Sequence, residues 1–376
     1  MKKNVLIDYR ISDTKKYLGN SFPPLLYKYL KKTNKYNVYD LSNKKLPKID
    51  LLFIINGGSH WNYIDLKVNN FDYRQVIKWI YPKIERYVIW IGFFFGLYRL
   101  QFYQRHLFRN RSYEKHIEKI IKDNPKIKII HRLDGSYQTI CKVYGYDKTV
   151  KFLNDKAHLT IHQSNYSKKL WENKNETIFG KSIKLKPKKS IIINNGVDTN
   201  IFKPKKITKQ KKSTWKILHV SASSNPKKGL YRILEIAYSL KENNKFKFLL
   251  IGKQINDPVC GGDIKYFKNV KYIGDEKDRL KIAKIYRNCD ILFFPSLEDC
   301  SPNVILEAMS SGLPILTLNS GGIKELIHKE NLKAGVFLDK KNPILSLDFI
   351  IRNYSNFYKN TQIIIKKYHN YKNSLQ

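Results

Sequence analysis

Acidic side chains are scarce in this sequence. Its 376 residues contain 31 Asp and Glu against 71 Lys and Arg, a formal net charge of +40 at pH 7. This imbalance restricts the expected partners to polyanions: nucleic acid, anionic membrane or phosphorylated small molecules. The chain is also crowded with Lys, Asn, Ile and Tyr, and coding composition alone can produce such a bias. Net charge therefore does not choose among the three.

Cysteine is nearly absent too. None of the four cysteines lies in a C-x-x-C pair or at a metal-ligand spacing, so we expect reduced thiols and no disulfide framework. The first residues, MKKNVLIDYR, run straight into a strand-like segment and lack the apolar stretch and cleavage site of a signal peptide. A cytoplasmic protein is the resulting expectation.

Long apolar runs are missing as well. Residues 87–98, YVIWIGFFFGLY, are flanked by basic residues and are far short of the roughly 20 residues of a spanning helix. Two interpretations stay open. The segment either lies peripherally on an anionic membrane, at its inner face, or forms a buried helix of the first domain.

What the sequence does contain is an alternation of strand and helix signals. In the first part of the chain the predicted helices lie around 21–32 and 112–123, and the predicted strands at 4–9, 50–56, 126–133, 157–164 and 191–198. This order predicts a parallel sheet with helices on both faces.

A second alternating series follows a basic, polar stretch that suits a linker. Its predicted helices are 229–240, 278–289 and 303–311, and its predicted strands are 216–221, 247–252, 269–274, 290–296 and 313–318. Two doubly wound units predict a cleft between domains, with ligands near the carboxyl ends of strands. The predicted organisation is a first domain over 1–203, a linker over 204–214, a second domain over 215–345 and a helical tail over 346–376.

The most informative stretch is 290–325, DILFFPSLEDCSPNVILEAMSSGLPILTLNSGGIKEL. A buried strand is followed by Glu298 and Asp299, a helix that carries Glu307 opens near Asn303, and another strand ends at Gly321-Gly322. The free N–H groups at a helix start suit a phosphate, and carboxylates accept hydrogen bonds from sugar hydroxyls. The local chemistry therefore suggests a diphosphate flanked by sugars.

This stretch resembles the donor-site signature of the family 4 group of retaining glycosyltransferases, of the bacterial polysaccharide-biosynthesis type. That signature has two Glu separated by seven residues. Here Asp299 and Glu307 keep the spacing, with Asp in place of the first Glu. The Pro-Asn, the Glu-Ala-Met and the Gly-Leu-Pro also match.

The resemblance implies a GT-B fold, two Rossmann-like doubly wound domains facing each other across a cleft. It implies that Glu307 holds the ribose hydroxyls of a nucleotide and that Asp299 faces the donor sugar, with Glu298 as a second candidate. Around them, the backbone of Asn303, Val304 and Ile305 and the glycines Gly196, Gly321 and Gly322 complete the expected donor site.

A second match, HVSASSNPKKGLYRILEIA, resembles the strand, loop and helix in which a basic pair grips the diphosphate. Lys228 falls on the Lys position, whereas the Arg expected five or six residues earlier is missing. Lys227 is either a substitute for that Arg or a solvated lysine.

The first domain gives weaker matches. NNGVDTNIFKP at 194–204 resembles the segment that closes this domain, and HRLDGS at 131–136 resembles a His-Arg-Leu/Ile-Asp-Gly-Pro motif. The resemblance implies catalytic roles for His131 and Asp134 and an acceptor contact for Arg132, although His131 can equally be a packed strand residue. Further acceptor-side candidates are the glycine turns Gly19-Asn20 and Gly57-Gly58.

The expected activity is transfer of a sugar from a nucleotide-diphosphate sugar to a saccharide or lipid-linked acceptor, in cell-surface polysaccharide biosynthesis. No Asp-x-Asp is present to hold a metal–diphosphate pair, so we expect a retaining transfer with no metal and no cofactor, in which lysine, backbone amides and a helix dipole neutralise the leaving group. The alternatives are a sugar-nucleotide epimerase of the same architecture and, in another class, a basic nucleic-acid-binding protein. The basic residues are spread over both halves of the chain, which argues against nucleic acid as a partner. The sequence also lacks the G-x-G-x-x-G motif that a dehydrogenase would have.

Overall fold

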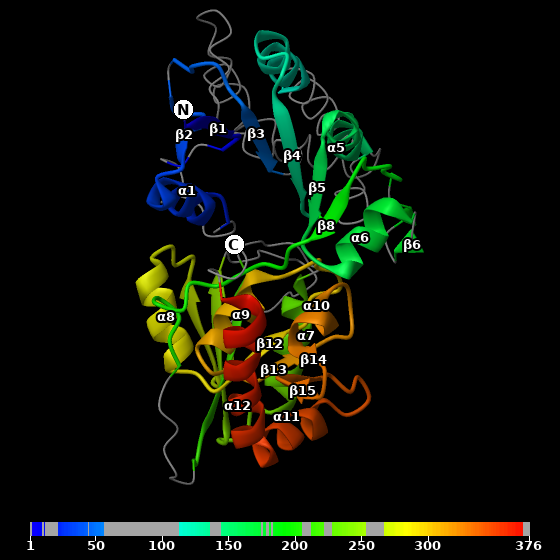
Figure 1. Ribbon diagram of the computed structural model, residues 1–376. Helices are drawn as coiled ribbons and strands as arrows, with labels where there is room; N and C mark the ends of the chain where they lie inside the picture. Colours follow the sequence, from blue (N-terminus) through cyan, green and yellow to red (C-terminus); the bar gives the residue numbers. More distant parts are fainter. Residues whose placement is uncertain are drawn as a thin grey trace, which may run out of the picture. The chain divides into compact units, whose positions relative to one another are not determined.

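The computed structural model (Figure 1) describes residues 2–9, 11, 22–43, 45–55, 113–135, 144–173, 176–177, 180–181, 183–204, 212–221, 228–252 and 267–370. The chain divides into two compact units. The first contains residues 1–10, 36–160 and 169–190, and the second contains 11–35, 161–168 and 191–376. The glycine turns Gly19-Asn20 and Gly57-Gly58, the segment 87–98 and Lys227 lie outside the described residues.

One six-stranded sheet has the order β2-β1-β3-β4-β5-β8. Strand β1 pairs in parallel with β2 and β3, and β3 pairs in parallel with β4. The strands are β1 (Lys3–Ile7), β2 (Tyr36–Asp40), β3 (Leu51–Ile55), β4 (Lys128–Leu133), β5 (Leu159–His162) and β8 (Ser190–Ile192).

The core of this sheet forms where alternate strand residues meet a helix over residues 113–123. Leu6, Leu52 and Ile129 pack with Tyr113 and Ile117 of that helix, and all five are buried. The remaining elements of this part of the chain are α1 (Phe22–Thr33), α5 (Tyr144–Lys156), α6 (Asn165–Glu172), β6 (Glu176–Thr177) and β7 (Gly180–Lys181).

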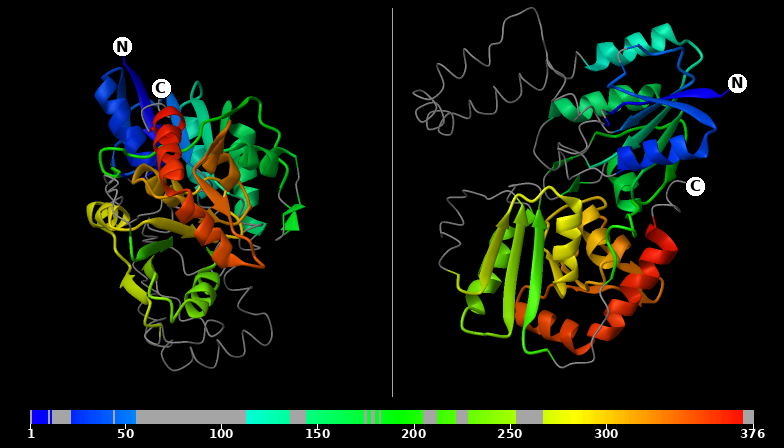
Figure 2. Two further views of the ribbon diagram at one scale, coloured as in Figure 1. Left: turned by 90° about the horizontal axis from the view of Figure 1, so that it is seen from below. Right: turned by 90° about the vertical axis from the view of Figure 1, so that its left-hand side faces the viewer.

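The other six-stranded sheet has the order β11-β10-β9-β12-β13-β16, and every neighbouring pair is parallel. The right-hand view of Figure 2 shows its first strands side by side in green to yellow. The strands are β9 (Trp215–Ser221), β10 (Phe246–Gly252), β11 (Val270–Gly274), β12 (Ile291–Phe294), β13 (Ile315–Thr317) and β16 (Gly335–Phe337).

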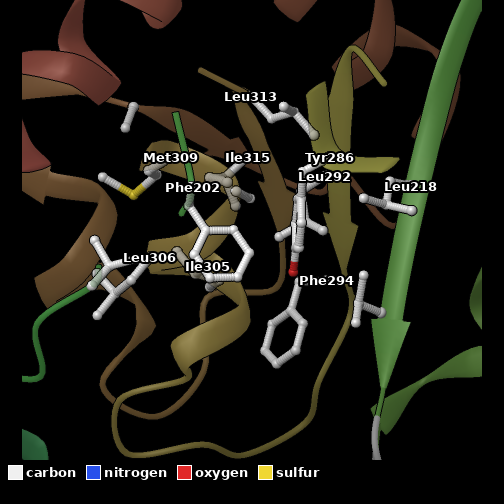
Figure 3. Packing of buried hydrophobic residues seen from close by; sticks show 14 of the residues in the cluster. Phe202, Leu218, Tyr286, Leu292, Phe294, Ile305, Leu306, Met309, Leu313 and Ile315 are labelled. Atoms are coloured by element: carbon white, nitrogen blue, oxygen red, sulfur yellow. The ribbon is translucent and has the colours of Figure 1, made fainter. Parts of the chain in front are cut away.

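Both faces of this second sheet are covered, as the sequence predicts. Along β12, Ile291 and Phe293 belong to one apolar cluster, whereas Leu292 and Phe294 belong to another. Successive side chains of a strand point to opposite faces, so the two clusters lie on the two sides of the sheet. Figure 3 shows the second of them, with Leu218 packed among residues of the neighbouring helices.

The helices around this sheet carry recognisable start signals. Asp278 accepts hydrogen bonds from the backbone N–H groups of Leu280 and Lys281 and so caps α8, while Asn342 caps α11 with Pro343 in its first turn. The elements are α7 (Leu230–Ser239), α8 (Arg279–Arg287), α9 (Asn303–Ser310), α10 (Ile323–Ile327), α11 (Pro343–Arg352), α12 (Tyr354–Ile364), η5 (Ile365–His369) and the hairpin β14 (His328–Lys329) and β15 (Leu332–Lys333).

Two strands, β2 and β16, were not predicted from the sequence pattern. Strand β2 carries polar residues at the edge of its sheet, and β16 has only three residues, so neither gives a clear alternation. Within the predicted tail, the described residues include α12 and most of α11. Within the described parts of the chain, no helix has the length and apolar character needed to cross a membrane.

Candidate functional site

The most distinctive cluster of the second unit lies where β9, β12 and β13 end. Lys228 follows β9, Asp299 follows β12, and Gly321-Gly322 follow β13. Since parallel strands end at one edge of a sheet, these loops meet. The Nζ atom of Lys228 lies 2.7 Å from Oδ2 of Asp299, which makes a partly exposed ion pair.

The glycine turn is shaped around the backbone of Asp299. The N–H of Gly322 donates to the carbonyl oxygen of Asp299 at 2.8 Å. A Cβ at Gly321, where φ is +57°, would lie 2.2 Å from that same oxygen, and one at Gly322 would lie 2.1 Å from the carbonyl oxygen of Cys300. Only glycine permits both approaches. The turn therefore holds in place the loop of Glu298, Asp299 and Cys300, called the acidic loop below.

The loop of Lys228 depends on a glycine as well. Gly229 has φ of +75°, and a Cβ there would lie 2.3 Å from the carbonyl oxygen of Pro295. That contact seats the start of α7 on the end of β12 and brings Lys228 over the ring of Phe294, 5.8 Å from its centroid. Both partners of the ion pair are therefore fixed through backbone contacts.

Helix α9 begins directly after the acidic loop. Pro302 precedes it, and no side chain caps its first turn. The side-chain amide of Asn195 donates to the carbonyl of Ser301 at 2.9 Å and to Oδ1 of Asn303 at 3.1 Å, which ties the residue before Gly196 to this helix start. Asn303 and Val304 are partly exposed, whereas the N–H of Ile305 donates to the carbonyl of Pro302, so the backbone N–H groups of Asn303 and Val304 are the ones that can meet an anion.

Glu307 lies one turn further along α9. Burial raises its pKa to about 7, while the charge of Arg279 and a hydrogen bond from Tyr286 act in the opposite direction. The hydroxyl of Tyr286 donates to Oε2 of Glu307 at 3.4 Å, and a guanidinium nitrogen of Arg279 lies 3.9 Å from Oε1. Figure 3 shows Tyr286 in the same apolar cluster as Ile305 and Leu306 of this helix.

Glu298 has its own partner. It is buried, and the hydroxyl of Tyr166 donates to its Oε1 atom at 2.7 Å. Asp299 rather than Glu298 is the carboxylate that lies beside Lys228.

No sequence motif predicts the roles of Tyr166, Arg279 and Tyr286. Each reaches its carboxylate from a distant part of the chain, and no local motif marks it. The same is true of His219 on β9. Burial lowers its pKa to about 4, and its Nδ1 lies 3.2 Å from the carbonyl oxygen of Phe293.

The first unit holds a separate set of predicted residues. On β4, His131 is buried with its Nδ1 3.3 Å from the side-chain amide of Asn154. Arg132 lies 3.5 Å from Asp134 in an ion pair, and burial lowers the pKa of Arg132 to about 10. Asp134 is partly exposed, and its carbonyl accepts a hydrogen bond from the indole of Trp171 at 2.8 Å.

The second half of the chain is similar to known glycosyltransferases. Residues 214–356 match the family model described as glycosyl transferases group 1. A galactosyltransferase of Escherichia coli, UDP-Gal:alpha-D-GlcNAc-diphosphoundecaprenol alpha-1,3-galactosyltransferase, is 29% identical over 177 residues. The match covers 42% of this chain and 44% of that enzyme, so this chain spans less than half the length of that relative.

Solved structures extend the likeness to the whole chain. Sucrose-phosphate synthase from Thermosynechococcus elongatus is 12% identical with a TM-score of 0.62, over 100% of this chain and 96% of its own. The Anabaena protein HepE, solved in complex with UDP-glucose, is 15% identical with a TM-score of 0.58, over 100% and 98%. The chain therefore has the GT-B fold, and its residues 214–356 match the family model of glycosyl transferases group 1.

Proposed function

We propose that this chain transfers a sugar from a nucleotide-diphosphate sugar to a saccharide or lipid-linked acceptor. The observation that carries the proposal is the ion pair of Lys228 and Asp299 beside the start of α9, inside the family-matched region. A cation and free helix N–H groups suit a diphosphate, and a neighbouring carboxylate suits sugar hydroxyls. A sugar-nucleotide epimerase would use the same contacts, so the match of residues 214–356 to the glycosyl transferases is what favours a transferase over it. A nucleic-acid-binding protein gains no support from these contacts.

In the proposed donor complex the ammonium group of Lys228 balances the negative charge of the diphosphate. Its three N–H donors let it contact a phosphate oxygen while it keeps Asp299 oriented. Glu307 accepts from the ribose hydroxyls, with Arg279 and Tyr286 keeping its carboxyl group in place. The first turn of α9 completes the diphosphate contact through its backbone.

The proposed chemistry retains the configuration of the sugar and needs neither a metal nor a cofactor. The bond from the anomeric carbon to the diphosphate oxygen breaks while the acceptor oxygen bonds to the same face, and the acceptor proton passes to the departing diphosphate. Lys228 and the α9 dipole stabilise the charge that develops on that leaving group. No side chain has to form a covalent intermediate.

The acceptor side is proposed to involve His131, Arg132 and Asp134 on the first unit. The acceptor class is proposed by analogy with the Escherichia coli relative, which acts on alpha-D-GlcNAc-diphosphoundecaprenol. A lipid-linked acceptor of this kind suits a cytoplasmic enzyme at the inner face of the membrane in polysaccharide biosynthesis. The proposal includes a peripheral contact of residues 87–98 with that membrane.

The test is a screen of nucleotide sugars for thermal stabilisation of the full chain, since a ligand that binds only the folded state raises the melting temperature. At 100 times Kd the expected stabilisation is about 2.7 kcal/mol. Glu307→Gln should bind the same ligand more weakly, whereas Glu235→Gln, an exposed change on α7, should not. A protein that no nucleotide sugar stabilises and that transfers no sugar to an acceptor would contradict the proposal.

A further inference from the structure

The acidic loop is held from a side that the donor site does not use. The two neighbours of Asp299 in sequence, Glu298 and Cys300, are both bound by one short segment. Within it, Tyr166 donates its hydroxyl to Oε1 of Glu298 at 2.7 Å, and Ser164 donates its hydroxyl to the carbonyl of Cys300 at 2.8 Å. All of these residues belong to the second unit.

The segment that grips the loop is itself fixed by a carboxylate. Glu325 on α10 accepts hydrogen bonds from the backbone N–H groups of Asn165 at 2.8 Å and Tyr166 at 2.7 Å. These are the first two residues of α6, so Glu325 acts as the cap that such a helix start requires. A carboxylate at this end also interacts favourably with the helix dipole.

The contacts form a closed circuit around Asp299. Helix α10 starts directly after the glycine turn, whose Gly322 N–H binds the carbonyl of Asp299. Glu325 of α10 holds Tyr166, and Tyr166 returns to Glu298, the residue before Asp299. Burial of the Tyr166 hydroxyl, and then its bond to Glu298, raise the pKa of that hydroxyl. The phenol therefore stays a hydrogen-bond donor.

We propose that Tyr166 is a positioning residue, which fixes the backbone around Asp299 through Glu298 so that the Asp299 carboxylate stays at its contact with Lys228. This inference rests on the proposed function. In this proposal the contacts of Ser164 and Tyr166 affect the rate of sugar transfer, whereas Glu307 and the start of α9 determine the affinity for the nucleotide. Glu325 supports it by capping the helix from which Tyr166 projects.

The test compares Tyr166→Phe with Tyr238→Phe, which removes a hydroxyl from an exposed ring on α7. Both are made in the full chain, and transfer kinetics and the Kd of the free nucleoside diphosphate are measured. We expect Tyr166→Phe to lower kcat about tenfold with that Kd unchanged within about twofold, and Tyr238→Phe to alter neither. Glu298→Gln and the double variant then complete a cycle. Because Tyr166 acts through Glu298, the double variant should lose no more than the worse single one.

Three results would overturn the inference alone: a Tyr166→Phe enzyme with the wild-type kcat, one whose kcat and nucleotide affinity fall together, or a double variant whose losses multiply. A wild-type chain that transfers no sugar from any nucleotide sugar overturns the proposed function and the inference with it. Ser164→Ala gives a second arm, since it removes the hydrogen bond to the Cys300 carbonyl together with the one that Ser164 accepts from the Ser167 N–H at the start of α6. We expect it to lower kcat as well, again with the nucleotide Kd unchanged.

Discussion

At the scale of single residues, the second unit keeps one carboxyl group in an unfavourable environment. Glu307 packs against Tyr286 with 15% of its side chain exposed, and a guanidinium nitrogen of Arg279 lies 3.9 Å from its carboxylate. Its folded pKa of about 7 lies above its ordinary value of 4.5. The proton is therefore bound more tightly in the folded state. The stability that this gives is complete below pH 4.5 and is lost as the pH rises through 7.

Replacing Glu307 by Gln should thus make the protein more stable at pH 8, by on the order of 2 kcal/mol, and should flatten its stability between pH 4.5 and 7. Urea unfolding at several pH values measures this. Asp8, another buried carboxyl with a pKa of about 7, contributes equally to both proteins and cancels. Glu235→Gln, at an exposed site, is the matched control. An equally steep pH dependence in Glu307→Gln would show that the carboxyl group does not titrate as described.

The ion pair of Lys228 and Asp299 makes a different prediction. Lys228→Ala should lower kcat/KM about 100-fold, because the charge that develops on the diphosphate loses the cation that we propose stabilises it. Thermal unfolding should change little, since the pair is partly exposed. Lys284→Ala, an exposed change on α8, removes the same charge away from the pair and serves as the control. Equal turnover by both variants would place the diphosphate elsewhere.

At the scale of elements, the loops that follow the strands of the second sheet are held together by contacts between their main chains. The glycine turn after β13 touches the backbone of the acidic loop, and Gly229 touches the end of β12. These are contacts between main chains. They therefore depend on the absence of a side chain, and the sequence marks them only as glycines.

Gly321→Ala tests this at one position. The variant places a Cβ 2.2 Å from the Asp299 carbonyl oxygen and forces a positive φ, so we expect a loss of more than about 1 kcal/mol of stability together with a loss of transfer. Gly274→Ala separates the two causes, because Gly274 has φ of +100° with nothing within 4 Å of the added Cβ. It should show the cost of strain with normal transfer. Transfer at the wild-type rate by a folded Gly321→Ala enzyme would contradict this role of the turn.

At the scale of the whole molecule, the charge of +40 is compatible with a substrate that carries a diphosphate. Because we propose that Lys228 and the α9 dipole neutralise that group, transfer should persist in excess EDTA. The measurement is the initial rate after chelation, with and without added magnesium or manganese. An activity that EDTA abolishes and either metal restores would require a metal-bound leaving group in place of this one.

The sequence by itself determined the α/β alternation, the two covered faces of the second sheet and the stretch 290–325 that carries Lys228's partner. These follow from local information: burial repeats every second residue along a strand, and a helix such as α8 takes its cap from the residue directly before it. Only the tertiary structure decided that Tyr166 meets Glu298, 132 residues away in the chain, and that Arg279 and Tyr286 surround Glu307. Strand order and the backbone angles of a few loops bring such pairs together, and neither leaves a periodic signal in the sequence.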